Sequence, residues 1–175
     1  MEINYLGHSC FKVTGKKISI LMDPFDQAKV GIKLGKQDAD VVTVSHAHAD
    51  HSNLKVMKND GYLLLDSPGE YEIKDSEFIG IEAFHDDVNG DDRGKVTIFV
   101  VEVEGVRFAH LGDLATELTS DQLERLDGVD VLMIPVGGVY TLDAKLAVKV
   151  ISQIEPKIVL PMHFKVSESA DDFKD

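Results

Sequence analysis

The stretch SHAHADH gathers three of the chain's seven histidines and one aspartate within a few positions. It continues the apolar run Val41–Val44, which is typical of a buried strand. In an extended segment His46 and His48 project to the same side, and Asp50 and His51 follow at the turn. Imidazole and carboxylate groups suit zinc, and iron and manganese also accept them. The stretch therefore indicates half of a metal site, with a histidine-rich solvated loop as the alternative.

Three more candidate ligands follow apolar runs further along the chain. His85 comes after the run that ends at Phe84, Asp113 follows the letters HLG, and His163 follows Pro161-Met162. Each has an ordinary alternative: a surface hairpin residue for His85, a turn or helix cap for Asp113, and a core histidine for His163. Taken from the residues alone, these candidates are weaker than the first motif.

His8, Asp23 and His110 are candidates for supporting such a site. His8 lies in GHSCF between two predicted strands, Asp23 follows a strand in LMDPF, and His110 ends a strand shortly before Asp113. A metal ligand commonly needs a hydrogen-bonding partner behind it, which is one role for these residues. Contact with a substrate is another role for His8 and His110. A turn or core position is the structural alternative for each of them.

Short apolar runs, separated by Gly, Pro and Asp turns, predict the strands that position these residues. In the first part of the chain they are Glu2–Tyr5, Cys10–Thr14, Lys17–Met22, Val41–Val44, Tyr62–Leu65, Glu77–Phe84, Lys95–Glu102 and Val106–His110. The last two read as a hairpin joined at Glu104-Gly105. The later part alternates helix Ser120–Arg125, strand Val131–Ile134, helix Asp143–Ile154 and strand Ile158–Leu160. Hairpins followed by strand–helix–strand units predict an α/β or α+β fold.

Composition limits the class of protein. The 175 residues, 43% hydrophobic and 28% charged, predict one globular domain over residues 1–175, with a flexible tail at 166–175. The net charge of −13 argues against nucleic acid and anionic membrane as partners, since both attract Lys/Arg patches. No apolar run approaches the ~18–20 residues of a membrane span, and no signal-peptide pattern opens the chain. The single cysteine, Cys10, favours a cytoplasmic location.

The chain resembles the metallo-β-lactamase superfamily, on motifs that run in order along almost its whole length. These motifs are YLGHSCF, SHAHADH, PGEYEI, FHDD, HLGD, PVGG and PMHF. Within the superfamily it is similar to the group of predicted zinc-dependent hydrolases that includes ascorbate-phosphate lactonase-like proteins. The resemblance implies a four-layer αββα sandwich that holds two divalent metal ions, with Zn²⁺ expected and Mn²⁺ or Fe²⁺ as alternatives.

The resemblance also implies a role for individual residues. The expected ligands are His46, His48 and His85 for one ion, Asp50, His51 and His163 for the other, and Asp113 as the bridge. Asp50 would also orient the hydroxide that the ions generate, which makes it the expected catalytic residue. Asp23 resembles a residue that orients a ligating histidine, and His8 belongs to a loop near the metal mouth.

Together these expectations describe a metal-dependent hydrolase that attacks an ester, lactone or phosphoester of a small molecule with a dinuclear-metal-activated hydroxide. An iron-dependent oxidoreductase on the same fold and a non-catalytic metal-binding domain are the alternatives. Two other features are less specific. Gly137-Gly138 would let backbone approach the site closely, or they make a plain turn. In the loop HDDVNGDDRGK, a solvated hairpin, Arg93 and Lys95 either meet a phosphate or carboxylate or balance the aspartates.

Overall fold

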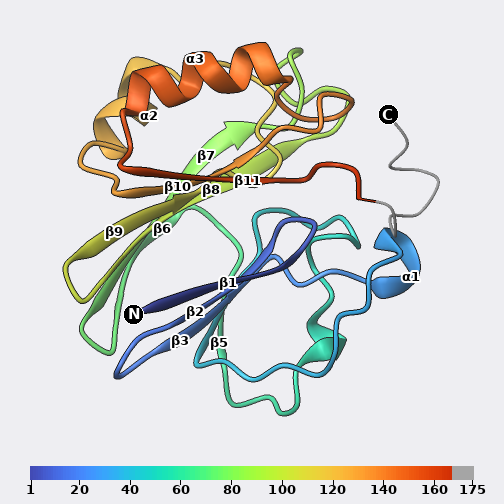
Figure 1. Cartoon of the computed structure of the whole chain (residues 1–175), viewed down its shortest axis with the longest axis vertical. Helices are drawn as coiled ribbons and strands as arrows, with labels where there is room; N and C mark the ends of the chain where they lie inside the picture. Colours follow the sequence, from blue (N-terminus) through green and yellow to red (C-terminus); the bar gives the residue numbers. More distant parts are fainter. Residues whose placement is uncertain (167–175) are drawn as a thin grey trace.

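Two mixed β-sheets pack face to face, and helices α2 and α3 lie over the second of them (Figure 1). The computed structural model describes residues 1–166. The first sheet has the order β1-β2-β3-β4-β5 and the second β11-β10-β9-β8-β7-β6. The strands are β1 Glu2–Gly7, β2 Cys10–Thr14, β3 Ser19–Met22, β4 Val41–Thr43, β5 Leu63–Leu65, β6 Gly69–Ile73, β7 Ser76–Phe84, β8 Lys95–Val103, β9 Val106–His110, β10 Val131–Pro135 and β11 Ile158–Met162. The helices are α1 Gln27–Val30, the 3-10 turn η1 Leu54–Val56, α2 Ser120–Arg125 and α3 Ala144–Ile154.

Apolar side chains form three cores, one at each boundary between layers. The core between the sheets contains the fully buried rings of Phe11, Phe78, Phe99 and Phe108. A second core joins the outer face of the second sheet to α2 and α3, and a third joins the outer face of the first sheet to α1, η1 and their loops. The predicted sandwich is therefore confirmed, and its layer over the first sheet consists mostly of loops.

The predicted strands and helices are all present, with ends that differ by no more than two residues. The predicted hairpin turn is also confirmed, because Glu104 and Gly105 both have positive φ, at 55° and 76°, as a two-residue hairpin turn requires. Strand β6 and helix α1 were not predicted. Strand β6 lies at the edge of its sheet and is only half buried, and α1 is too short to leave a helical periodicity.

Strand direction brings the candidate residues to one edge of the sandwich. In the first sheet β3, β4 and β5 are parallel, and β1 runs the same way because two antiparallel pairings separate it from β3. In the second sheet β7, β9, β10 and β11 share one direction by the same reasoning. The polar residues follow β1, β3, β4, β7, β9 and β11 at the carboxyl ends of these strands. Parallel carboxyl ends meet at one edge, where α/β sheets usually place their sites.

Helix α3 begins with a side-chain cap that makes one small prediction. Oδ1 of Asp143 accepts a hydrogen bond from the backbone N–H of Leu146 at 2.7 Å. We expect Asp143→Ala to lower the free energy of unfolding by about 1 kcal/mol, because this N–H then loses its acceptor. Urea unfolding followed by circular dichroism measures the change. Asp143→Asn, which keeps an acceptor, serves as the matched control. If the unchanged protein and both variants are equally stable, the Asp143 cap does not stabilise the protein.

The predicted flexible tail at 166–175 lies, from residue 167 on, outside the described residues. That residues 1–175 form a single domain stays a prediction. Within residues 1–166 no helix has both the length and the apolar character needed to cross a membrane.

Candidate metal centre

The segment after β4 supplies the first group of ligand atoms. His46 and His48 come from this segment, and His85 follows β7 in the other sheet. One nitrogen of each ring lies within 4.8 Å of the others. The rings of His46 and His85 meet edge to face with their centroids 4.8 Å apart. Three imidazoles predicted to share one metal ion therefore converge from both sheets.

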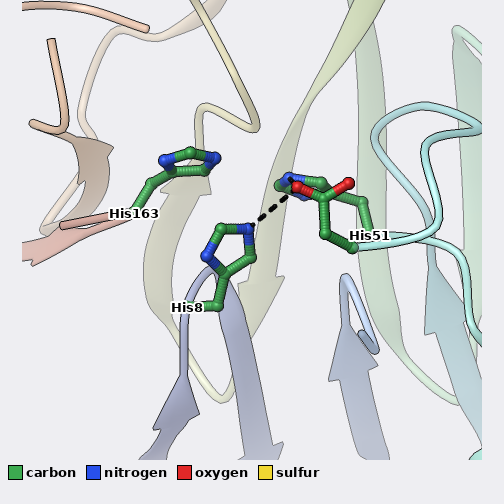
Figure 2. Close-up of side chains that lie close together, drawn as sticks. His8, His51 and His163 are labelled. Carbon is green, nitrogen blue, oxygen red and sulfur yellow. Dashed lines mark hydrogen bonds and ion pairs between the residues drawn. The ribbon is translucent and has the colours of Figure 1, made fainter. Parts of the chain in front are cut away.

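A second group lies beside the first and contains one member more than predicted. Asp50, His51 and His163 converge as expected, and His8 joins them, with all four ligand atoms within 4.8 Å of one another. Figure 2 shows His8, His51 and His163 pointing into a common space from three separate segments. Nε2 of His8 lies 3.3 Å from Oδ2 of Asp50, and the rings of His8 and His163 are 4.2 Å apart. His8 is thus a direct neighbour of the second group.

Asp113 lies between the two groups. Its Oδ2 is 3.2 Å from Nε2 of His51 and of His163, 3.3 Å from Nε2 of His85, and 3.8 Å from Nε2 of His46. The residue is buried, with 2% of its surface exposed. A single carboxylate that faces imidazoles of both groups has the position of a bridging ligand.

Asp23 sets the orientation of two of these imidazoles from behind. Its carboxylate accepts hydrogen bonds from the backbone N–H of Ser45 at 2.7 Å, from Oγ of Ser45 at 2.5 Å and from Nδ1 of His51 at 2.8 Å. Since Oγ of Ser45 donates to Asp23, it accepts from Nδ1 of His46, 2.9 Å away. This network requires a proton on Nδ1 of each ring, so Nε2 is the ring atom of both His46 and His51 that is left to bind a metal. Such second partners fix the tautomer of metal-binding histidines.

The protonation states suit a cation. Burial, together with neighbouring His51, lowers the pKa of His46 to about 3, and burial lowers the pKa of His8 to about 4. Both rings are therefore neutral near pH 7. Burial opposes ionisation of Asp50 and Asp113, yet the adjacent imidazoles hold the pKa of each carboxyl below its usual range. Neutral imidazole and ionised carboxylate are the forms that bind metals.

Buried polar atoms of the candidate ligands that lack a hydrogen-bond partner also indicate a site for a divalent cation. Nε2 of His46, Nε2 of His51 and Oδ1 of Asp113 are buried without a hydrogen-bond partner. Buried polar atoms are normally paired, so such a cluster needs a physical reason. Nε2 of His51 lies 3.2 Å from Oδ2 of Asp113. Burial opposes a positive charge on His51, yet Asp113 and Asp23 raise the pKa of this ring well above its usual value, so the site favours a positive charge at this point, either a proton or a metal cation. The residues present therefore fit divalent metal ions.

A pocket of about 340 Å³ opens over both groups, which is within the usual size for a small-molecule site. Its lining consists of Lys29, His48, Ala49, Asp50, His85, Arg93, Asp113, Tyr140 and His163. The expected close approach of backbone is also present, since a Cβ on Gly137 would lie 2.3 Å from the carbonyl oxygen of His163. Only glycine fits there without displacing the loop that carries His163.

His110 lies behind the centre and does not line the pocket. Its Nε2 donates to the carbonyl oxygen of Ser9 at 2.8 Å, and its Nδ1 accepts from the N–H of Gly112 at 3.2 Å. Both ring nitrogens are thus engaged with backbone, which favours the structural alternative for this residue. The ring connects the end of β9 to the loop that carries His8.

Three residues of the site were not singled out from the sequence. Ser45 lies inside the quoted motif, and its position directly before His46 was the available signal. Lys29 and Tyr140 lie on α1 and on the loop between β10 and α3. Neither of these belongs to a motif or periodic pattern, so only the folded arrangement reveals them.

A two-sheet sandwich with a histidine–aspartate cluster at the carboxyl ends of its strands defines a class of metal-binding protein. The chain belongs to the metallo-β-lactamase superfamily, because the model of the β-lactamase superfamily domain matches residues 2–163. The predicted resemblance is confirmed at this level.

Relatives and solved structures agree with this membership. A UPF0173 metal-dependent hydrolase of Thermococcus onnurineus is 27% identical over 99% of this chain and 91% of its own. A crystal structure from Thermotoga maritima, of a proposed zinc-dependent hydrolase of the superfamily, is 36% identical with a TM-score of 0.79, covering 98% of this chain and 82% of that one. Igni18, a metallo hydrolase of Ignicoccus hospitalis, shares the fold at 23% identity and a TM-score of 0.71, over 93% and 82% of the two chains. The similarity to ascorbate-phosphate lactonase-like proteins stays a prediction.

Proposed function

We propose that this protein is a metal-dependent hydrolase that holds two divalent cations, most simply zinc, at the candidate centre. The observation that carries the proposal is the place of Asp113, whose one oxygen faces imidazoles of both ligand groups within 3.8 Å. The proposed ligands are His46, His48 and His85 for one cation, Asp50, His51 and His163 for the other, and Asp113 for both. The names of the Thermococcus and Thermotoga relatives, both hydrolases, support the reaction class.

The metal ions and the side chains have separate tasks in this proposal. When bound, two divalent cations polarise the attacked carbonyl or phosphoryl group and make water acidic enough to lose a proton near neutral pH. Asp50 lines the pocket as an ionised carboxylate and is the group we assign to accept that proton and pass it to the leaving group. His8, 3.3 Å from Asp50, holds this carboxylate in place.

The proposed substrate is an ester, lactone or phosphoester of a small molecule. A pocket of about 340 Å³ suits a ligand of that size. The net charge of −13 disfavours a nucleic-acid backbone as substrate. The lone Cys10 is fully buried, which is compatible with the cytosolic location that we propose.

A metal-reconstituted screen tests the function. Protein stripped with a chelator is reloaded with Zn²⁺, Mn²⁺ or Fe²⁺ and assayed on phosphodiesters, lactones, thioesters and β-lactams. We expect the stripped protein to be inactive, and zinc or manganese to restore hydrolysis of one substrate class at two metal equivalents per chain. Absence of hydrolysis with every metal would contradict the proposal. Native protein that contains iron and consumes oxygen would support the oxidoreductase alternative instead.

A further inference from the structure

We infer that Arg93 and Tyr140, with Lys29 nearby in the same pocket, bind an anionic group of the substrate, a carboxylate or a phosphate. This inference rests on the proposed function and concerns the part of the substrate that does not react. The three residues line the same pocket as His48, Asp50 and Asp113. A ligand in that pocket therefore contacts the candidate metal centre at one end and these side chains at another.

Arg93 is held by an aromatic ring, and no acidic residue among the described residues 1–166 pairs with it. Its Cζ lies 3.8 Å from the centroid of the Tyr140 ring. A guanidinium stacked on a ring keeps the N–H donors at its edge available for a planar or tetrahedral oxyanion. Within residues 1–166 no carboxylate forms an ion pair with Arg93 or with Lys29. Lys95, the other cation of the same loop, instead pairs with Glu82 at 2.8 Å.

Asp86 builds the loop that carries Arg93 to the pocket. Oδ1 of Asp86 accepts from the backbone N–H groups of Val88 and Gly90, at 3.0 and 2.6 Å. Its Oδ2 accepts from those of Asp92 and Arg93, at 3.2 and 2.8 Å. The side chain is only 7% exposed. One buried carboxylate therefore fixes the backbone of the loop, which was expected to be a plain solvated hairpin, and fixes the starting point of the Arg93 side chain.

Charge makes an anion the fitting ligand. The chain carries a net charge of −13, which on balance repels anions. Arg93 and Lys29, which have no acidic partner within residues 1–166, lie in the pocket that contains the candidate metal ligands and are a local exception to this charge. A guanidinium prefers oxyanions that accept two parallel hydrogen bonds, which carboxylate and phosphate both do. The pocket is therefore suited to a small molecule with an acidic substituent.

Isothermal titration of the metal-loaded protein with inorganic phosphate, and separately with succinate, tests the inference. Any contact of the anion with metal is common to all variants. A difference in anion affinity between two variants therefore measures the contribution of the side chain that was changed. We expect Arg93→Gln to weaken the binding of one or both anions roughly 10- to 100-fold. Tyr140→Ala is expected to weaken it by less, and Tyr140→Phe to retain it. The anion that depends on Arg93 identifies the substituent.

Arg125→Gln is the matched control, because it removes the same charge at a distance. The guanidinium of Arg125 pairs with Glu70 at 3.3 Å, and its carbonyl oxygen accepts a hydrogen bond from Arg107 at the start of β9, the opposite end of that strand from Asp113. The affinity of the Arg125→Gln variant for both anions should equal that of the unchanged protein. The inference is overturned if Arg93→Gln binds both anions as tightly as the unchanged protein, or if the unchanged protein binds neither anion. If the protein hydrolyses a substrate but Arg93→Gln leaves anion affinity unchanged, only the proposed anion site is wrong. If Arg93→Gln weakens anion binding but no substrate is hydrolysed, only the proposed reaction is wrong.

Discussion

Asp113→Ala is expected to lower metal-dependent hydrolysis at least about 1,000-fold, because several kcal/mol of charge stabilisation by metal depend on the position of the ions. Asp113 places one carboxylate oxygen within 3.8 Å of Nε2 of four imidazoles, which belong to both ligand groups. Without it the two cations would face each other with no negative charge between them. We expect elemental analysis of the variant to find less than two metal equivalents per chain.

The control for this experiment separates the site from the fold. Asp87→Ala removes a carboxylate close to His85 in the sequence, but Asp87 is exposed and should leave metal content and turnover unchanged. Far-UV circular dichroism of Asp113→Ala should match that of the unchanged protein, since the three apolar cores do not include this residue. A folded Asp113→Ala protein that keeps two metal equivalents and full activity would exclude the proposed centre.

The sequence predicted the parts of this centre that depend on short-range order. SHAHADH places four candidate ligands on one segment, and a buried strand before it fixes which edge of the sheet they reach. His85, Asp113 and His163 were assigned mainly from the resemblance to the superfamily, and each also follows an apolar run that became β7, β9 or β11. Strand ends are predictable from local patterns, because alternation and turn residues mark them within a few positions.

The rest of the candidate site depends on contacts between segments that are distant in the sequence, and no local sequence pattern predicts such contacts. Asp23 meets Ser45 and His51 only because β3 and β4 pair in parallel, so their following residues lie side by side. Arg93 and Tyr140 lie in loops far apart in the sequence and meet only in the folded chain. For the same reason the sequence alone leaves both alternatives open for Arg93 and Lys95, of which Lys95 pairs with Glu82 in the structure.

The buried position of Asp23 leads us to expect a large effect of its hydrogen-bond network on metal binding. Its carboxylate is fully buried and accepts three hydrogen bonds, two from Ser45 and one from His51. Burial opposes its ionisation, but nearby His110 and the hydrogen bond from His51 hold its pKa below the usual range. A permanent negative charge at this position keeps protons on the Nδ1 atoms of His46 and His51. The Nε2 atoms of both rings are therefore the ones that Asp23 leaves for the proposed metal ions.

Asp23→Asn is expected to weaken zinc binding about 10- to 100-fold, although the side chain keeps its size. The amide still has an oxygen for the N–H of Ser45, but its NH₂ group now faces Nδ1 of His51. Two N–H donors repel, so the proton of His51 moves to Nε2, the atom 3.2 Å from Asp113 that would bind metal. Zinc affinity, measured by competition with a chelating dye, reports this change of tautomer.

Ser45→Ala tests the part of the same network that connects Asp23 to His46 through Ser45. This variant removes the acceptor for Nδ1 of His46 and leaves the contact between Asp23 and His51 intact. We therefore expect a smaller loss of zinc affinity than for Asp23→Asn, with little change in urea unfolding of the metal-free protein. If Asp23→Asn binds zinc as tightly as the unchanged protein, the tautomer of His51 does not depend on Asp23. An equal loss in both variants would instead indicate that the path through Ser45 to His46 is the one that controls metal binding.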